Sequence, residues 1–153
     1  MSEPTKGRAV DQSTTGGART KAMSDRARAS YERCCAEPDF IPAFYRNFFA
    51  VCPEARPRFA HTDFRRQHNL LRHALSLLLL FPNKPDPEAR NLLRRVAERH
   101  GRNDLAIDPS LYAPFVDSLV TTVGQYDPDY SAEIEAAWRG TVAKGVDYMI
   151  SKY

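Results

Sequence analysis

The chain has 153 residues, a length suited to one domain that buries a single core. With 42% hydrophobic and 27% charged residues the composition is that of a globular protein, and a net charge of +3 is too small to indicate binding to nucleic acid. The longest unbroken apolar run, Leu77 to Phe81, is far too short to cross a bilayer, which argues against a membrane protein.

The N-terminal segment, residues 1–24, is rich in Ser, Thr, Gly, Lys and Arg and has almost no large apolar side chains. Such a segment cannot bury enough surface to offset the entropy lost on ordering. We therefore expect a disordered tail, followed by one ordered domain over residues 25–153. The N-terminus also lacks the apolar core of a secretory signal, which predicts a cytoplasmic location. The three cysteines, an odd number, are then expected to be reduced thiols.

From Asp25 onward apolar residues recur with a helical period and two-residue alternation is missing, so the sequence predicts an all-α fold without a sheet. Prolines, Asp-Pro pairs and a capping Thr-Asp pair set the predicted helix boundaries. The predicted helices cover about residues 25–36, 40–51 and 62–81, a segment that ends at His100 after a loop over residues 82–87, and two segments that begin at Asp108 and Asp127. A short helical turn is predicted to open at Pro53.

One histidine stands out because of its place in a helical stripe. Leu93, Val96, Ala97 and His100 recur at i, i+3, i+4 and i+7, and Gly101 ends the predicted helix. An imidazole held at the core-facing end of a rigid helix can serve as an axial ligand to a haem iron. On sequence alone, a histidine at a helix C-terminus is also commonly a surface residue that stabilises the helix dipole.

Three other histidines, at positions 61, 68 and 73, compete for a role in a site. In the predicted helix over residues 62–81, Gln67 and Leu71 share one stripe, and His68 lies about 100° further round the helix. We expect Gln67 rather than His68 to face the interior, because only this register turns Leu71 inward instead of Arg72.

The segment from Phe44 to Phe59 contains Phe-Tyr, then Asn, Phe, Pro-Glu, Arg-Pro and a closing Phe. This order resembles the second helix and the following corner of bacterial single-domain haemoglobins and of the globin domain of flavohaemoglobins. Further matches follow in chain order at Gln67, at His100, in the segment 107–112 and at Trp138. The resemblance covers the whole predicted domain, and it implies a globin fold of about six to eight helices around a haem pocket.

The resemblance also implies roles for individual residues. His100 resembles the proximal metal ligand to haem b (iron protoporphyrin IX), and covalent haem attachment is not indicated because the chain has no Cys-x-x-Cys-His motif. The backbone carbonyl of Val96, one turn earlier, is the candidate partner for the other ring nitrogen of His100. Tyr45 and Gln67 resemble the polar pair on the distal side, where a gas binds. The other haem contacts are expected to be Phe59, Leu71, Ile107, Tyr112 and, at a haem propionate, His61.

The distal pair predicts a preference for dioxygen. Bound dioxygen carries partial negative charge, so a hydroxyl donor such as that of Tyr45 stabilises it more than it stabilises carbon monoxide. Gln67 has both donor and acceptor atoms, and we expect it to donate to the gas and accept from Tyr45. The sequence therefore predicts tight, reversible dioxygen binding for storage or transport.

Other functions remain open on the sequence. Nitric oxide dioxygenation would need a separate reductase, because no Gly-x-Gly-x-x-Gly nucleotide-binding segment is present. A gas sensor acting through a partner, or a globin-like interaction module without haem, are further alternatives, and the protein is expected to be a monomer or a homodimer. The acidic residue that supports the proximal histidine in flavohaemoglobins is missing, and Tyr153 stands near its place. This departure weakens the case for peroxidase-like chemistry.

Overall fold

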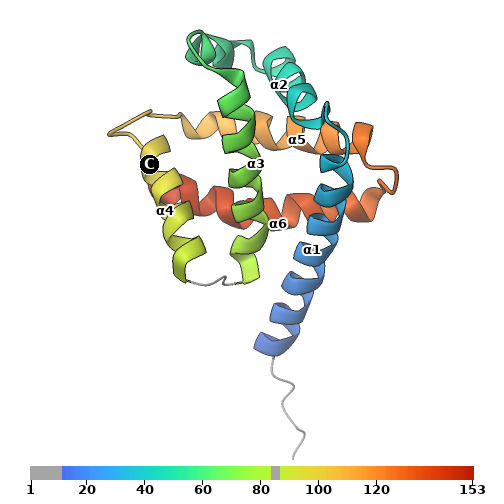
Figure 1. Ribbon diagram of the computed structural model, residues 1–153. Helices are drawn as coiled ribbons and strands as arrows, with labels where there is room; N and C mark the ends of the chain where they lie inside the picture. The colour runs from blue at the N-terminus through green and yellow to red at the C-terminus, as the bar shows by residue number, and fades with distance from the viewer. Residues whose placement is uncertain (1–11, 84–86) are drawn as a thin grey trace, which may run out of the picture.

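The computed structural model describes residues 12–83 and 87–153, and every regular element in these two ranges is helical. Figure 1 shows α5 and α6 running together, with α1 and α3 crossing them, and the C-terminal end beside α4. The predicted all-α fold is therefore confirmed for the described residues. In chain order the elements are α1 (Gln12–Cys35), α2 (Phe40–Val51), η1 (Pro53–Phe59), α3 (Phe64–Leu80), η2 (Phe81–Asn83), α4 (Pro87–His100), η3 (Pro109–Leu111), α5 (Tyr112–Tyr126) and α6 (Ala132–Ser151).

The first helix begins earlier than the sequence predicts. The expected disordered tail is wrong for residues 12–24, which are helical, whereas residues 1–11 lie outside the described ranges. Ser24 is fully buried, donates to the carbonyl of Leu79 at 2.6 Å and accepts from Asn83 Nδ2 at 3.0 Å. The prediction from composition was wrong because it counted large apolar side chains, whereas a small polar residue, Ser24, holds this part of the helix against the core. Residues 16–19, further along the helix towards its N-terminus, are exposed.

Local capping explains most of the other boundaries. Asp63 begins α3, since its carboxylate accepts from the backbone N–H groups of Arg65 and Arg66. The last helix was expected to begin at Asp127, but α6 begins at Ala132, where Ser131 Oγ accepts from Ile134 N at 3.2 Å. The Asp127 side chain has a different role, described below.

The hydrophobic core lies where α2 packs on α5 and where α1 covers α6. The predicted inward stripes supply much of it, and aromatic side chains of α2 fill the rest: Phe44 stacks on Phe48 at 5.7 Å and meets Phe115 edge-on at 5.1 Å. The largest side chains with almost no exposure are Trp138, Phe40, Phe44, Ile41, Leu75, Leu79, Leu93, Leu119, Val123 and Val142.

A buried carboxylate joins three parts of this core. The Asp127 side chain, directly after α5, is fully buried and accepts from Arg33 Nε at 2.7 Å and from Ser30 Oγ, both on α1. Ser30 Oγ accepts in turn from Trp138 Nε1 on α6 at 2.9 Å. Burial alone would raise the pKa of Asp127, but the hydrogen bonds from Arg33, Ser30 and the Asp129 N–H lower it overall. The charged form of this carboxylate therefore ties α1, α5 and α6 together.

Replacing this carboxylate tests its contribution to stability. Asp127→Asn removes the buried charged partner of Arg33 and leaves it only the exposed Asp129 at 3.5 Å, and we expect a loss of about 2–3 kcal/mol of unfolding free energy at neutral pH. The loss is smaller than for a fully buried pair because Arg33 is 30% exposed. Since the folded pKa of Asp127 is depressed, the stabilisation is complete above the usual carboxyl pKa and disappears as pH falls through the lower, folded value.

Urea unfolding gives the free energy of unfolding of both proteins at neutral pH and at several pH values below about 4, the ordinary carboxyl range. The difference between wild type and Asp127→Asn should shrink as the pH falls. Asp117→Asn is the control, because Asp117 also pairs with an arginine, Arg139, but is 64% exposed. It should cost no more than about 1 kcal/mol. Equal losses in the two variants would contradict the buried role of Asp127.

Candidate functional site

Tyr45 lies on the inner face of α2, where it is only 5% exposed. Aromatic rings surround it on several sides, at centroid distances between 5.2 and 5.9 Å. Because these rings come from α2, η1 and α3, they fix the orientation of the Tyr45 ring. The surrounding rings are those of Phe44, Phe49, Phe59, Phe64 and His68.

The hydroxyl group of Tyr45 is held by Gln67 of α3. Gln67 Nε2 donates to Tyr45 Oη at 3.0 Å, so the prediction that these two residues form a polar pair holds geometrically. The direction is opposite to our expectation, since Gln67 donates and Tyr45 accepts. Burial raises the pKa of Tyr45 to about 12, which keeps its proton in place at neutral pH. Among the described residues nothing accepts that proton, so it remains available to a ligand.

The register of α3 agrees with the prediction in part. Leu71 is 8% exposed and Leu75 is fully buried, as expected for the inward stripe. Gln67 and His68 are both half-buried, however, and both contact Tyr45, His68 by stacking on its ring at 5.5 Å. The sequence did not reveal the stacking role of His68.

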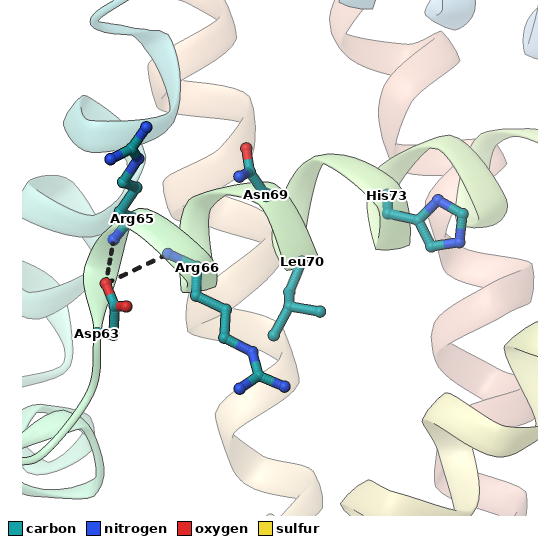
Figure 2. Close-up of a pocket in the computed structure, with 6 residues that line it drawn as sticks. All are labelled: Asp63, Arg65, Arg66, Asn69, Leu70 and His73. Atoms are coloured by element: carbon teal, nitrogen blue, oxygen red, sulfur yellow. Dashed lines mark hydrogen bonds between the residues drawn. The ribbon is translucent and has the colours of Figure 1, made fainter.

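A different stripe of α3 lines an open depression of about 400 Å³ (Figure 2). Arg66, Leu70 and His73 contribute to it, and Leu70 is 53% exposed. Gln67 and Leu71 are not among its lining residues. The depression is therefore a surface feature of one helix and is separate from the contacts of Tyr45.

His100 is the last residue of α4, and its ring is half-buried. Its Nδ1 lies 2.7 Å from the carbonyl oxygen of Val96, the partner that the sequence suggested. A carbonyl only accepts, so Nδ1 carries the proton and Nε2 keeps its lone pair. Burial, together with the charge of Arg99, lowers the pKa of His100 below its usual value despite the bond to Val96. His100 is therefore a neutral imidazole whose Nε2 can bind a metal.

The loop after His100 folds back on the end of α4. The N–H of Ile107 donates to the carbonyl of His100 at 3.0 Å, and the N–H of Leu105 donates to that of Arg99 at 3.0 Å. Ala106 donates to the Gly101 carbonyl at 2.8 Å and has a φ of 49°, in the left-handed region that L-residues rarely adopt. These bonds satisfy carbonyls that a helix end leaves open.

The C-terminal end of α6 packs against the same corner. The N–H of Arg102 donates to the Tyr153 carbonyl at 3.2 Å, and the guanidinium of Arg102 lies over the Tyr153 ring at 5.0 Å. A Cβ added at Gly101 would lie 3.1 Å from the Lys152 carbonyl, so a larger residue would crowd this contact. Tyr153 thus lies close to the residues that follow His100, as the sequence analysis expected.

The other residues predicted for the site fall into two groups. Phe59 is half-buried and lies with Tyr45 and Gln67, while Ile107 and Tyr112 are half-buried and follow His100 in the loop and at the start of α5. His61 is exposed beyond η1. Its predicted contact with a haem propionate is untested.

Comparison with known proteins identifies the family. The family model described as Globin matches residues 42–149. The chain belongs to the globin family. This globin is also similar to a crystal structure of a Pseudomonas aeruginosa protein described as structurally highly homologous to a human haemoglobin. The TM-score is 0.79 and the sequence identity 36%, over 86% of this chain and 98% of the other. No curated protein matches the sequence.

Membership in this family confirms the globin fold and implies a haem cofactor. The side chains present fit such a group. His100 offers a neutral nitrogen for iron, Tyr45 offers a buried proton to a gas, and apolar side chains line both groups of residues. In the described part of this globin, no helix combines the length and apolar character needed to cross a membrane.

The strained backbone at Ala106 gives a stability prediction. Glycine adopts a positive φ without the steric cost that alanine pays, so Ala106→Gly should raise the unfolding free energy by about 0.5–1 kcal/mol. Ala136→Gly, at an exposed position inside α6, should lower it by about 1 kcal/mol. Urea unfolding of the three proteins checks both values. A loss of stability in Ala106→Gly would show that Ala106 does not adopt the left-handed conformation in solution.

Proposed function

We propose that this globin binds haem b through His100 and uses Tyr45 and Gln67 to bind dioxygen reversibly. The observation that carries the proposal is the buried Tyr45 hydroxyl, which accepts from Gln67 at 3.0 Å and keeps its own proton for donation. When bound, the haem supplies an iron centre at which a diatomic gas such as dioxygen, nitric oxide or carbon monoxide can bind and leave.

His100 is proposed as the iron ligand because of its fixed tautomer. The hydrogen bond from Nδ1 to the Val96 carbonyl orients the ring and directs the lone pair to Nε2. Partial burial favours the neutral form, which is the form that binds metals. The chain therefore supplies a nitrogen ligand that needs no proton change to bind.

Tyr45 is proposed as the donor to the gas. Its proton stays on the oxygen at neutral pH, and Gln67 supplies the hydrogen bond that the oxygen would otherwise need from water. Phe59, Phe64 and His68 hold the ring edge-on or stacked, so the hydroxyl cannot swing towards solvent without disturbing all three. A donor fixed in this way favours a ligand that gains negative charge over one that stays neutral.

Apolar side chains are proposed to exclude water from the haem. Leu71 is buried one turn after Gln67, and Ile107 and Tyr112, which follow His100 along the chain, are partly buried. Water and anions promote oxidation of ferrous haem, so an apolar surround supports reversible binding.

Removing the proposed ligand tests the haem assignment. His100→Ala should abolish the high-affinity uptake of haem and the sharp Soret band on titration with hemin, because it removes the proposed iron ligand. His73→Ala, which alters an exposed histidine of α3, should behave as wild type. Equal haem uptake by His100→Ala and wild type would overturn the assignment.

A second variant tests the distal role. Tyr45→Phe keeps the aromatic packing and removes the donor, so the dioxygen dissociation rate should rise about 10- to 100-fold, the equivalent of one hydrogen bond to a charged group. The carbon monoxide dissociation rate should change much less. Stopped-flow measurements of both gases give the comparison. An unchanged dioxygen rate would contradict the proposal for Tyr45 while leaving that for His100 intact.

A further inference from the structure

Arg58 connects two segments that are far apart in the sequence. It lies in η1, one residue before Phe59, and its Nη1 donates to the carbonyl of Leu105 at 3.0 Å. Its Nη2 lies 3.5 Å from the carbonyl of Ala106, a longer contact with the next carbonyl of the same loop. One guanidinium thus links the segment that packs on Tyr45 to the loop that follows His100.

The contacted residues are those that hold the end of α4. Three backbone N–H groups of the loop donate to backbone carbonyls at distances between 2.8 and 3.0 Å. The bonds run from Leu105 to Arg99, from Ala106 to Gly101 and from Ile107 to His100. Each of these amides belongs to the loop whose carbonyls meet Arg58. A displacement of the loop would therefore release the carbonyl of His100 and loosen the last turn of α4.

The backbone at Ala106 shows that the loop needs support. A non-glycine residue with a φ of 49° is held in an unfavourable conformation and persists only where its surroundings fix it. Arg58 contacts the carbonyl of Ala106 and that of the residue before it. These contacts oppose relaxation of the strained residue.

We propose that Arg58 is a positioning residue for His100, acting through the carbonyls of Leu105 and Ala106. It holds the loop over residues 101–107 against the end of α4 and thereby fixes the imidazole of His100. The same contacts join η1 to this loop. The proposal deepens the proposed function, because its spectroscopic readouts require haem bound at His100.

The experiment compares three variants with wild type. Arg58→Met keeps the length of the side chain and removes the donors, Arg58→Lys keeps a charge and a donor, and Arg139→Met is the control. Arg139 makes two side-chain bonds, to Glu135 and Asp117, on α6 and α5, remote in sequence from the loop. The measurements are haem dissociation to an excess of apomyoglobin, the iron–histidine stretching band of the ferrous protein and amide hydrogen exchange.

Arg58→Met should raise the haem dissociation rate about ten-fold, the scale of one hydrogen bond from a charged donor. It should also shift or broaden the iron–histidine band and speed exchange of the Leu105, Ala106 and Ile107 amides. Arg58→Lys should restore most of each effect, and Arg139→Met should show none.

Unchanged exchange of the three loop amides in Arg58→Met would overturn the proposal whether or not haem is bound. An unchanged haem dissociation rate and iron–histidine band would overturn it too, even where stability falls. If the proposed function is wrong, wild type will take up no haem through His100. The exchange of the loop amides still tests the Arg58 contacts in that case.

Discussion

The hydrogen bond from His100 Nδ1 to the carbonyl of Val96 is the contact on which the proposed haem site of this globin depends. It assigns the proton to one ring nitrogen and leaves the lone pair of the other free, which is the form that the proposed iron ligand requires. The bond stays within one turn of α4, but the position of that turn depends on the loop over residues 101–107 and on the end of α6. The orientation of His100 therefore depends both on a bond within its own helix and on segments that pack against the end of that helix.

Tyr45, which we propose as the donor to a bound gas, follows the same physical rule. The neighbours of this side chain restrict its motion: aromatic rings pack around the phenol, and Gln67 donates to its oxygen without taking its proton. A buried polar group usually pairs all of its donors and acceptors. The Tyr45 hydroxyl is an exception among the described residues, since its proton has no acceptor there, and the proposed function assigns that donor to a bound gas.

Much of the fold and of the candidate site could be predicted from the sequence. Helical periodicity located α2 and α3, and Asp63 and Pro53 marked where helical segments begin. The pairing of His100 with Val96 followed from one-turn spacing. Contacts between distant segments could not be predicted, because spacing carries no information about them. Three such contacts have no local signature in the sequence: the hydrogen bonds from Ser24 to Leu79, from Ser30 to Asp127 and from Arg58 to Leu105.

The length of α1 has a consequence for how the molecule opens. A Cβ added at Gly16 or Gly17 would have no atom within 4 Å, and from Gly16 onward the first fully buried residue is Ser24. Helical turns without tertiary contacts fray at little free-energy cost. Fraying can progress to about Thr20, whose Oγ1 accepts from Lys144 of α6 at 3.3 Å, and the buried bonds of Ser24 to Leu79 and Asn83 oppose it further. The beginning of α1 can therefore exchange between ordered and melted turns while the loop and the last turn of α4 around His100 keep their geometry.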